Sequence, residues 1–274
     1  MTAPLLRMLG AQTMAELRAR WRVAAFSVTS LVLPVVFFTF FGLPYASQTF
    51  PDGVSVGAYL LVSFAAYGVG NVMVYGFGIG VANERGMKVD LLMRATPLPP
   101  AVAVLAKVLV ALAFALVSIV VLIVFGVVVG GIRQELAVWL QVIARLLAGS
   151  MPFVALGFAI GYTAGPHAAP ALANLIYLPL SFASGLFLPV SQLPGFVQKI
   201  APYLPSYHYG QLAWSAVGAR AEPLAVSPQV CSAPALRLVK TRPPRTTTGA
   251  DWWSSNRLVV ELSPSWPALL RPQQ

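Results

Sequence analysis

Long apolar runs separated by short polar stretches dominate this sequence. Five such runs can be counted: Val23 to Leu43, Val54 to Ala82, Val108 to Ile132, one within Leu136 to Thr163, and Ala168 to Leu188. The first holds 21 residues without a charge, which as a helix would cover about 31 Å, close to the roughly 30 Å of a bilayer's hydrocarbon core. Runs of these lengths can satisfy their backbone hydrogen bonds in lipid only as helices. The pattern therefore predicts an all-α polytopic membrane protein with five transmembrane helices.

The first run is also too long for a signal peptide, whose apolar core has about 7–15 residues, so we expect it to be retained. Ahead of it stand arginines at positions 7, 18, 20 and 22 against the single acid Glu16. The loop 44–53 has no Lys or Arg, whereas the loop 83–107 carries four, namely Arg85, Lys88, Arg94 and Lys107. The positive-inside rule places the N-terminus and the loop 83–107 in the cytoplasm.

Aromatic residues near the ends of the runs fit the same orientation. We expect Trp21 at the inner membrane interface and, at the outer one, Trp139, Tyr203, Tyr207, Tyr209 and Trp214. Residues 1–22 form a cytoplasmic segment with Leu5, Leu6, Leu9, Met14 and Leu17 between its arginines. That pattern fits an amphipathic interfacial helix on the inner membrane surface, and it fits a simple basic anchor equally well.

Composition removes several other classes of protein. Hydrophobic residues make up 58% and charged residues 9% of the chain, against about 25% charged residues in soluble domains. The net charge is +10, but the basic residues are scattered and no basic stripe with interleaved aromatics precedes residue 230, so nucleic acid is not an expected partner. Cys231 is the single cysteine, which excludes an intrachain disulfide and a cysteine metal cluster.

Motifs of catalysis are missing from the sequence. The two histidines, His167 and His208, fall in loops on opposite sides of the predicted membrane and are not assigned to a metal. No nucleotide-binding loop, nucleophile elbow or zinc-protease motif occurs. We therefore expect no cofactor and no enzymatic activity of the chain itself.

The loop NERGMKVDLLMRATPLPP, between the second and third runs, is the first of two informative passages. It begins where a long helix emerges, turns at Gly86 and offers a short mixed-charge helix from Met87 to Arg94. Pro97, Pro99 and Pro100 then stop helix growth before the third run. On composition alone this is an ordinary solvated loop whose charges set the topology.

The second informative passage, residues 174–214, begins as a membrane helix, breaks at Ser184-Gly185 and leaves the membrane through a series of prolines. Phe196, Val197 and Ile200 give one apolar face, and Lys199 can reach the surface. Two interpretations fit these residues: an extracellular loop with proline turns, or a short re-entrant hairpin in the outer leaflet.

Together the two passages resemble the permease subunit of type-2 ABC exporters, of the drug- or daunorubicin-resistance-like group. The resemblance covers roughly residues 5–220. In the cytoplasmic loop it is carried by Glu84, Gly86, Leu91, Leu92, Thr96-Pro97-Leu98 and Lys107. In the outer passage it is carried by Asn174, Pro179, Gly185, Pro189, Leu193-Pro194, Ile200, Pro202, Pro205 and Gln211.

The resemblance implies roles for both passages. The cytoplasmic loop would be a coupling helix that docks into a groove on an ATPase subunit, a role that falls on Glu84, Arg85, Asp90, Arg94 and Pro97. The outer passage would be a re-entrant hairpin that closes the exit of the substrate path, with Asn174, Gly185, Pro189, Pro194, Pro202 and Pro205 as its gate residues.

The function implied is that of the membrane subunit of an ATP-driven exporter in the bacterial cytoplasmic (inner) membrane. A separate ABC ATPase would bind ATP, and the chain would pair with itself as a homodimer or with a related permease, surrounded by membrane lipid. The substrate exported would be an amphipathic drug, as in multidrug efflux, a lipid or a lipid-linked molecule. One alternative is an ATP-independent secondary transporter, which the shortage of intramembrane carboxylates disfavours. Another is a non-transporting membrane scaffold.

Three further features complete the prediction. Glycine pairs at Gly126/Gly130, Gly157/Gly161 and Gly161/Gly165 permit close helix packing. Arg145 is a functional candidate if it lies inside the fourth span, but we favour a position at the outer edge of that span. The family's sixth helix is not apparent, because residues 227–274 hold seven prolines, six Lys or Arg and two acids. We thus divide the chain into residues 1–22, a transmembrane permease domain 23–226 and a tail 227–274, which we expect to be disordered and hypothesise to be frame-shifted or truncated.

Overall fold

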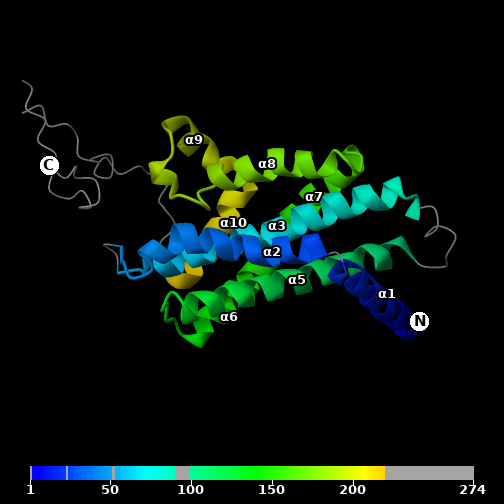
Figure 1. Ribbon diagram of the computed structural model, residues 1–274, viewed down its shortest axis with the longest axis horizontal. Helices are drawn as coiled ribbons and strands as arrows, with labels where there is room; N and C mark the ends of the chain where they lie inside the picture. The colour runs from blue at the N-terminus through cyan, green and yellow to red at the C-terminus, as the bar shows by residue number, and fades with distance from the viewer. Residues whose placement is uncertain (1, 23, 51–52, 90–98, 220–274) are drawn as a thin grey trace, which may run out of the picture. The chain divides into compact units, whose positions relative to one another are not determined.

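The computed structural model describes residues 2–22, 24–50, 53–89 and 99–219 (Figure 1). The chain divides into two units, Met1–Ala221 and Glu222–Gln274, and the described residues all belong to the first. They form helices joined by short turns, with one isolated bridge between Thr49 and Ser55. The predicted all-α class is confirmed. The predictions for residues 90–98 and for the tail 227–274 lie outside the described residues.

The helices follow one another along the chain with few irregular residues between them. Their bounds are α1 (Thr2–Trp21), α2 (Ala24–Phe37), α3 (Val56–Gly86), α5 (Pro100–Val128), α6 (Leu136–Ala148), α7 (Met151–Thr163), α8 (Ala169–Ala183), α9 (Gly195–Ile200) and α10 (Pro205–Trp214). A π-helical turn, Phe38–Gly42, and a 3₁₀ turn, Leu43–Tyr45, extend α2. Further 3₁₀ turns occur at Val190–Gln192, Ala201–Tyr203 and Ser215–Val217.

The five predicted spans correspond to these helices. Three stretches are long and apolar enough to cross a membrane: Val56–Gly86, Pro100–Val128 and the consecutive helices of Leu136–Thr163. Two shorter apolar stretches, Ser30–Tyr45 and Ala169–Ala183, overlap the first and fifth predicted runs, which had the bounds Val23–Leu43 and Ala168–Leu188. The protein is therefore a polytopic helical membrane protein.

Helix α3 is the centre of the bundle. In its most apolar window 94% of the residues are buried, against 39% in α5 and 33% in Leu136–Thr163. It contacts α2, α5, α7, α8 and α10, and Figure 1 shows it running between α2 and α7. Its many glycines and alanines explain this position, because small side chains let neighbouring helices approach closely in a membrane protein.

One helix boundary differs from the prediction. Helix α3 ends at Gly86, where the turn was predicted, but α5 begins at Pro100 rather than at Val108. Proline is compatible with the first turn of a helix, where its missing N–H has no partner to lose. Prolines thus start α5 instead of delaying it, and this places Lys107 inside a helix.

Two of the apolar runs are interrupted where glycine and serine stand side by side, and one of these breaks was predicted. The fourth run is interrupted at Gly149-Ser150, between α6 and α7. Helix α8 ends at Ala183, and Gly185 has a φ of +82°, a left-handed conformation that glycine adopts without strain. The break predicted at Ser184-Gly185 is confirmed.

Proline inside α2 is accommodated by a neighbouring helix. Pro34 cannot donate a backbone hydrogen bond to Ser30, which would leave that carbonyl unsatisfied. The Ser118 hydroxyl of α5 donates to the Ser30 carbonyl at 3.1 Å, and both residues are buried. A side chain on α5 therefore replaces the hydrogen bond that the proline removes, as expected for proline in a membrane helix.

The contact between α3 and α7 depends on two of the glycines singled out in the sequence. A Cβ atom at Gly157 would lie 2.8 Å from the Met73 carbonyl oxygen, and one at Gly161 would lie 2.8 Å from Val81 Cβ. These distances are shorter than ordinary contacts, so the two helices approach as closely as they do only because the Cβ atoms are absent. The predicted close packing is confirmed for this glycine pair.

Candidate functional site

A cluster of charged side chains joins three helices at one end of the bundle, which we call the basic end. Lys107 of α5 lies between two carboxylates: its Nζ is 2.7 Å from Glu16 Oε1 of α1 and 2.5 Å from Glu84 Oε1 of α3. The lysine is only 6% exposed. We call Glu16, Arg20, Glu84 and Lys107 the charge cluster.

The fourth member, Arg20, lies one helical turn after Glu16 on α1. Its guanidinium carbon is 5.8 Å from the centre of the Phe77 ring of α3, a distance at which cation and ring attract each other. Burial lowers the pKa of Arg20, while the charges of Glu16 and Glu84 raise it. With two cations and two anions, the charge cluster has no net charge.

The geometry of the charge cluster suits a lysine that must be buried. An ammonium group has three donor hydrogens and no acceptor, and burying it without a partner is unfavourable by several kcal/mol. Two carboxylates from different helices provide that partner. Lys107 therefore links α1, α3 and α5, and displacement of any one of these helices would disturb its ion pairs.

Arg85, the residue after Glu84, extends the connection to a fourth helix. Its Nη1 donates to the carbonyl oxygens of Gly161 at 2.9 Å and Tyr162 at 2.6 Å, and its guanidinium lies 5.5 Å from the centre of the Tyr162 ring. Carbonyls in the last turn of a helix have no partner within that helix, and a cation there is favourable. Arg85 thus caps the C-terminus of α7 instead of pointing freely into solvent.

The remaining residues assigned to ATPase coupling are only partly accounted for. Helix α3 ends at Gly86 as predicted, and Lys88 follows with a φ of 57°. Asp90, Arg94 and Pro97 lie outside the described residues, as does most of the helix expected from Met87 to Arg94. The coupling role of this segment stays a prediction.

At the other end of the bundle, which we call the hairpin end, α8 leads into the segment 184–214. The Ser184 and Ser206 hydroxyls are hydrogen-bonded to each other, joining the end of α8 to the start of α10. The assigned prolines begin the short helices of this segment: Pro194 precedes α9, and Pro205 is the first residue of α10. Pro189 precedes the 3₁₀ turn Val190–Gln192, and Pro202 is the second residue of the 3₁₀ turn Ala201–Tyr203.

Helix α10 is fixed to the bundle by aromatic side chains. The Tyr209 hydroxyl donates to the Leu146 carbonyl at 3.1 Å, and Trp214 Nε1 donates to the Ser63 hydroxyl of α3 at 2.7 Å. The Trp214 ring stacks on Tyr59 with centres 4.9 Å apart. The segment after α9 is therefore packed against α3 and α6.

The aromatics expected at the outer interface differ in exposure. Tyr203 is 86% exposed, whereas Trp139, Tyr207, Tyr209 and Trp214 are buried inside the protein. These four rings therefore pack within the bundle and do not face lipid, and the position of all five residues at the outer membrane interface stays a prediction.

Asn174, which the resemblance grouped with the hairpin, is not near it. It lies in the first half of α8, eleven residues before Gly185, or about 16 Å along the helix axis. Its side chain accepts a hydrogen bond from the Tyr75 hydroxyl of α3 and donates to the Pro170 carbonyl at 3.2 Å. The structure brings Gly185 and the four prolines into one segment but leaves Asn174 between α3 and α8.

Arg145 lies close to the break between α6 and α7. It is half-buried, and its Nη1 donates to the Ser215 hydroxyl at 2.7 Å. Among the described residues no group of three or more His, Cys, Asp or Glu is close enough to hold a metal ion.

Sequence reasoning missed the central role of Lys107 and its pairing with Glu16. The available signal was positional: a lysine seven residues into an apolar helix needs a carboxylate partner. Glu16 and Arg20 also stand four residues apart on one helix face, a spacing at which charges pair. Neither clue identifies the partner helix, which only the fold provides.

The helices described above define a polytopic helical membrane protein, and comparison with known proteins identifies the family. Residues 8–216 match the ABC-2 type transporter family, and the chain belongs to it. The chain is also 29% identical over 212 residues to a protein of Bacillus subtilis (strain 168) described as "Putative transport permease YvfS". That match covers 77% of this chain and 86% of the Bacillus protein. No solved structure matches.

Membership of this family implies an ABC ATPase as a partner. The predicted resemblance to a type-2 ABC permease is confirmed, and the matched range agrees with the 5–220 expected from the sequence.

Proposed function

We propose that this chain is the membrane subunit of an ATP-driven exporter in the bacterial cytoplasmic membrane, with its N-terminus and basic end in the cytoplasm. It would act as a dimer, with itself or with a related permease, and a separate ABC ATPase would bind at the basic end. Its substrate would be an amphipathic drug, a lipid or a lipid-linked molecule. The chain itself binds no ATP and catalyses no reaction in this proposal.

The observation that carries the proposal is the arrangement around Glu84 and Arg85. These two residues lie in the last turn of α3, just before the segment 87–98, which the family resemblance assigns to ATPase docking. Glu84 is paired to Lys107 of α5, and Arg85 holds the C-terminal carbonyls of α7. A displacement of this segment by the ATPase would therefore be transmitted to α1, α3, α5 and α7. The contacts that transmit it are made by Glu84 and Arg85, which directly precede the segment in the sequence.

The orientation rests on the distribution of basic residues. Arg20, Arg85 and Lys107 gather at the basic end, which matches the cytoplasmic excess of Lys and Arg in membrane proteins. Of the acids that the structure describes, Glu16 and Glu84 belong to this end, and Glu135 precedes α6. This arrangement supports ATP-driven transport better than ion coupling, which uses carboxylates within the spans.

Site-specific photocrosslinking tests where the ATPase binds. Met87, 68% exposed, follows α3 at the basic end, and Leu136, 73% exposed, starts α6 on the far side of the bundle. A benzophenone amino acid at position 87 should crosslink to the co-expressed ATPase, and the same group at position 136 should not. No crosslink from position 87, or equal crosslinks from both positions, would contradict the docking proposal.

Export is tested separately in inside-out membrane vesicles that contain the permease and its ATPase. Daunorubicin and a fluorescently labelled phospholipid represent two of the proposed substrate classes. ATP-dependent accumulation of either probe, lost when the ATPase is inactivated, supports export. Accumulation that follows a proton or sodium gradient without ATP would instead establish the secondary transporter.

A further inference from the structure

We propose that a groove between α1 and α5 binds one anionic phospholipid, with the headgroup at Arg18 and Arg22 and an acyl chain along α5. The groove measures about 470 Å³ and is lined by Leu17, Arg18, Trp21, Arg22, Ala113, Phe114 and Val117. This inference does not depend on the exporter assignment, because it concerns a lipid held by the permease and not its cargo.

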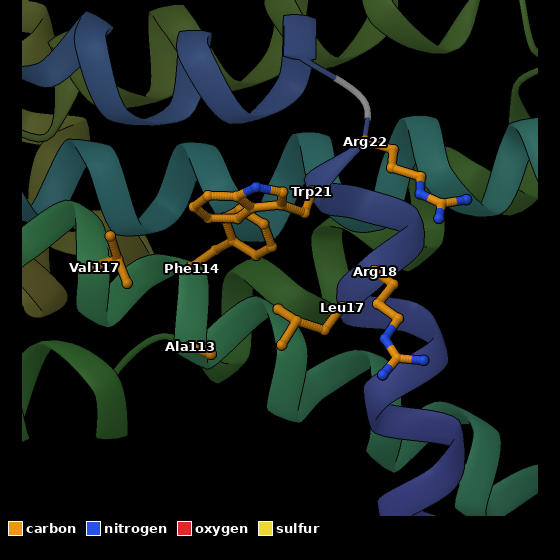
Figure 2. Close-up of a pocket in the computed structure, with 7 residues that line it drawn as sticks. All are labelled: Leu17, Arg18, Trp21, Arg22, Ala113, Phe114 and Val117. Carbon is orange, nitrogen blue, oxygen red and sulfur yellow. The ribbon is translucent and has the colours of Figure 1, made fainter.

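The floor and walls of the groove are apolar. Trp21 packs on Phe114 with ring centres 6.0 Å apart, and Figure 2 shows Leu17 directed toward α5 beside this pair. Val117 and Trp21 remain exposed, by 42% and 63%. Five of the seven lining residues are hydrophobic, so water in the groove gains little from polar contacts and a hydrocarbon chain would displace it favourably.

The length of the groove fits one leaflet of a membrane. Phe114 and Val117 lie seven and ten residues beyond Lys107 on α5, or about 10–15 Å along the helix axis. Half of a hydrocarbon core is also about 15 Å thick. The groove therefore reaches from the level of the charge cluster to about mid-membrane, as an acyl chain does.

The two arginines supply charge complementarity for an anion. They stand four residues apart on α1, and the backbone hydrogen bond from Arg22 N to Arg18 O, 3.3 Å, keeps them on one helix face. Figure 2 shows both guanidinium groups directed away from the Trp21–Phe114 pair. In the part of the chain that the structure describes, neither guanidinium has a hydrogen bond or an ion pair, whereas Glu16 is already bound to Lys107.

A single phosphate between these arginines would relieve the repulsion of two like charges at this spacing. Arginine suits that role because its planar donors match phosphate oxygens in pairs. A favourable helix dipole explains why arginines stand near the end of α1, but it does not explain an apolar groove that opens beside them. The two arginines match the charged headgroup of an anionic phospholipid, and the apolar groove matches its acyl chain.

Quenching of Trp21 by brominated lipids tests this site in the full-length purified protein. The signal of Trp21 is the difference between wild type and the Trp21→Phe variant in the same nanodiscs. We expect brominated phosphatidylglycerol to quench this signal with at least about a fivefold preference over brominated phosphatidylcholine, which is the contribution of one basic residue near an anionic surface. Equal quenching by the two lipids would overturn the proposal.

Matched charge variants separate a built site from general attraction to an anionic membrane. The double variant Arg18→Gln/Arg22→Gln should lose the preference, and the double variant Arg7→Gln/Arg133→Gln, which removes the same charge elsewhere, should retain it. Preference that survives in the first variant would show that Arg18 and Arg22 do not select the headgroup, and preference that disappears in both would show a general attraction to anionic lipid; either result would overturn the proposal.

Discussion

The basic end and the hairpin end of this protein are held together by different interactions. At the basic end, the buried Lys107 connects three helices through ion pairs with the partly exposed Glu84 and Glu16, and Arg85 connects a fourth. At the hairpin end, neutral hydroxyls and rings make the corresponding contacts, as Trp214 does with Ser63 and Tyr209 with Leu146.

These two kinds of interaction respond differently when the helices are displaced. Ion pairs in a buried site are sensitive to small displacements, because separating the charges exposes each to an unfavourable environment. Neutral hydrogen bonds and stacked rings lose less when they rearrange. This difference is what the proposed docking of an ATPase at the basic end would use: we propose that the basic end receives the motion of the ATPase and that the hairpin end adjusts to it.

The largest effect is expected from Lys107→Met. This change leaves the partly buried Glu16 and Glu84 close together without their shared cation, and it should lower the free energy of unfolding by about 3 kcal/mol. Thermal unfolding of the purified protein in detergent measures it. Lys199→Met, an exposed lysine of α9 at the hairpin end, is the control and should change stability by less than about 0.5 kcal/mol. Equal effects of both variants would remove the proposed contrast.

A smaller effect is expected where α7 packs against α3 between the two ends. Gly157→Ala places a Cβ 2.8 Å from both the Met73 carbonyl oxygen and Phe77 Cβ, and the helices must separate to admit it. We expect a loss of about 1–3 kcal/mol, the usual range for overpacking. Gly165→Ala meets no atom within 4 Å and serves as the matched control. If Gly157→Ala proves as stable as Gly165→Ala in thermal unfolding, the contact between α3 and α7 has room for a Cβ atom and does not depend on this glycine.

The smallest effect is expected at the hairpin end. Trp214→Phe removes the hydrogen bond to Ser63 but retains an aromatic ring against Tyr59, so the loss should be about 1 kcal/mol. A double-mutant cycle with Ser63→Ala isolates this contact, since the two changes should not add if they remove the same bond. Full additivity would mean that the indole N–H and the hydroxyl do not interact in the membrane-embedded protein.

Much of the fold follows from the sequence, because long apolar runs in a bilayer leave the chain few alternatives. The break at Ser184-Gly185 and the end of α3 at Gly86 were predictable from local chemistry. The start of α5 was not, since prolines that end one helix also begin another. The central position of α3 was not evident either, because a buried helix and a lipid-facing helix are both apolar.

The candidate site was predictable only in part. Glu84 and Arg85 were placed in the coupling segment, but their partners come from helices distant in sequence, Lys107 and Glu16 in one case and the end of α7 in the other. Asn174 was grouped with the hairpin through resemblance alone, and the fold pairs it with Tyr75 instead. Pairing across helices depends on packing angles that periodicity does not encode.

The central claim is that the charge cluster carries motion of the ATPase into the helix bundle. Hydrogen–deuterium exchange of the permease–ATPase complex in nanodiscs, with and without ATP and vanadate, tests it most directly. Trapping the ATPase should change exchange in peptides from both α1 and the start of α5. Glu16→Ala, which frees α1 while keeping the Glu84–Lys107 pair, should reduce the α1 response by at least half and preserve the α5 response, and the control Glu135→Ala should change neither. An α1 response of wild-type size in the Glu16→Ala variant would contradict the account.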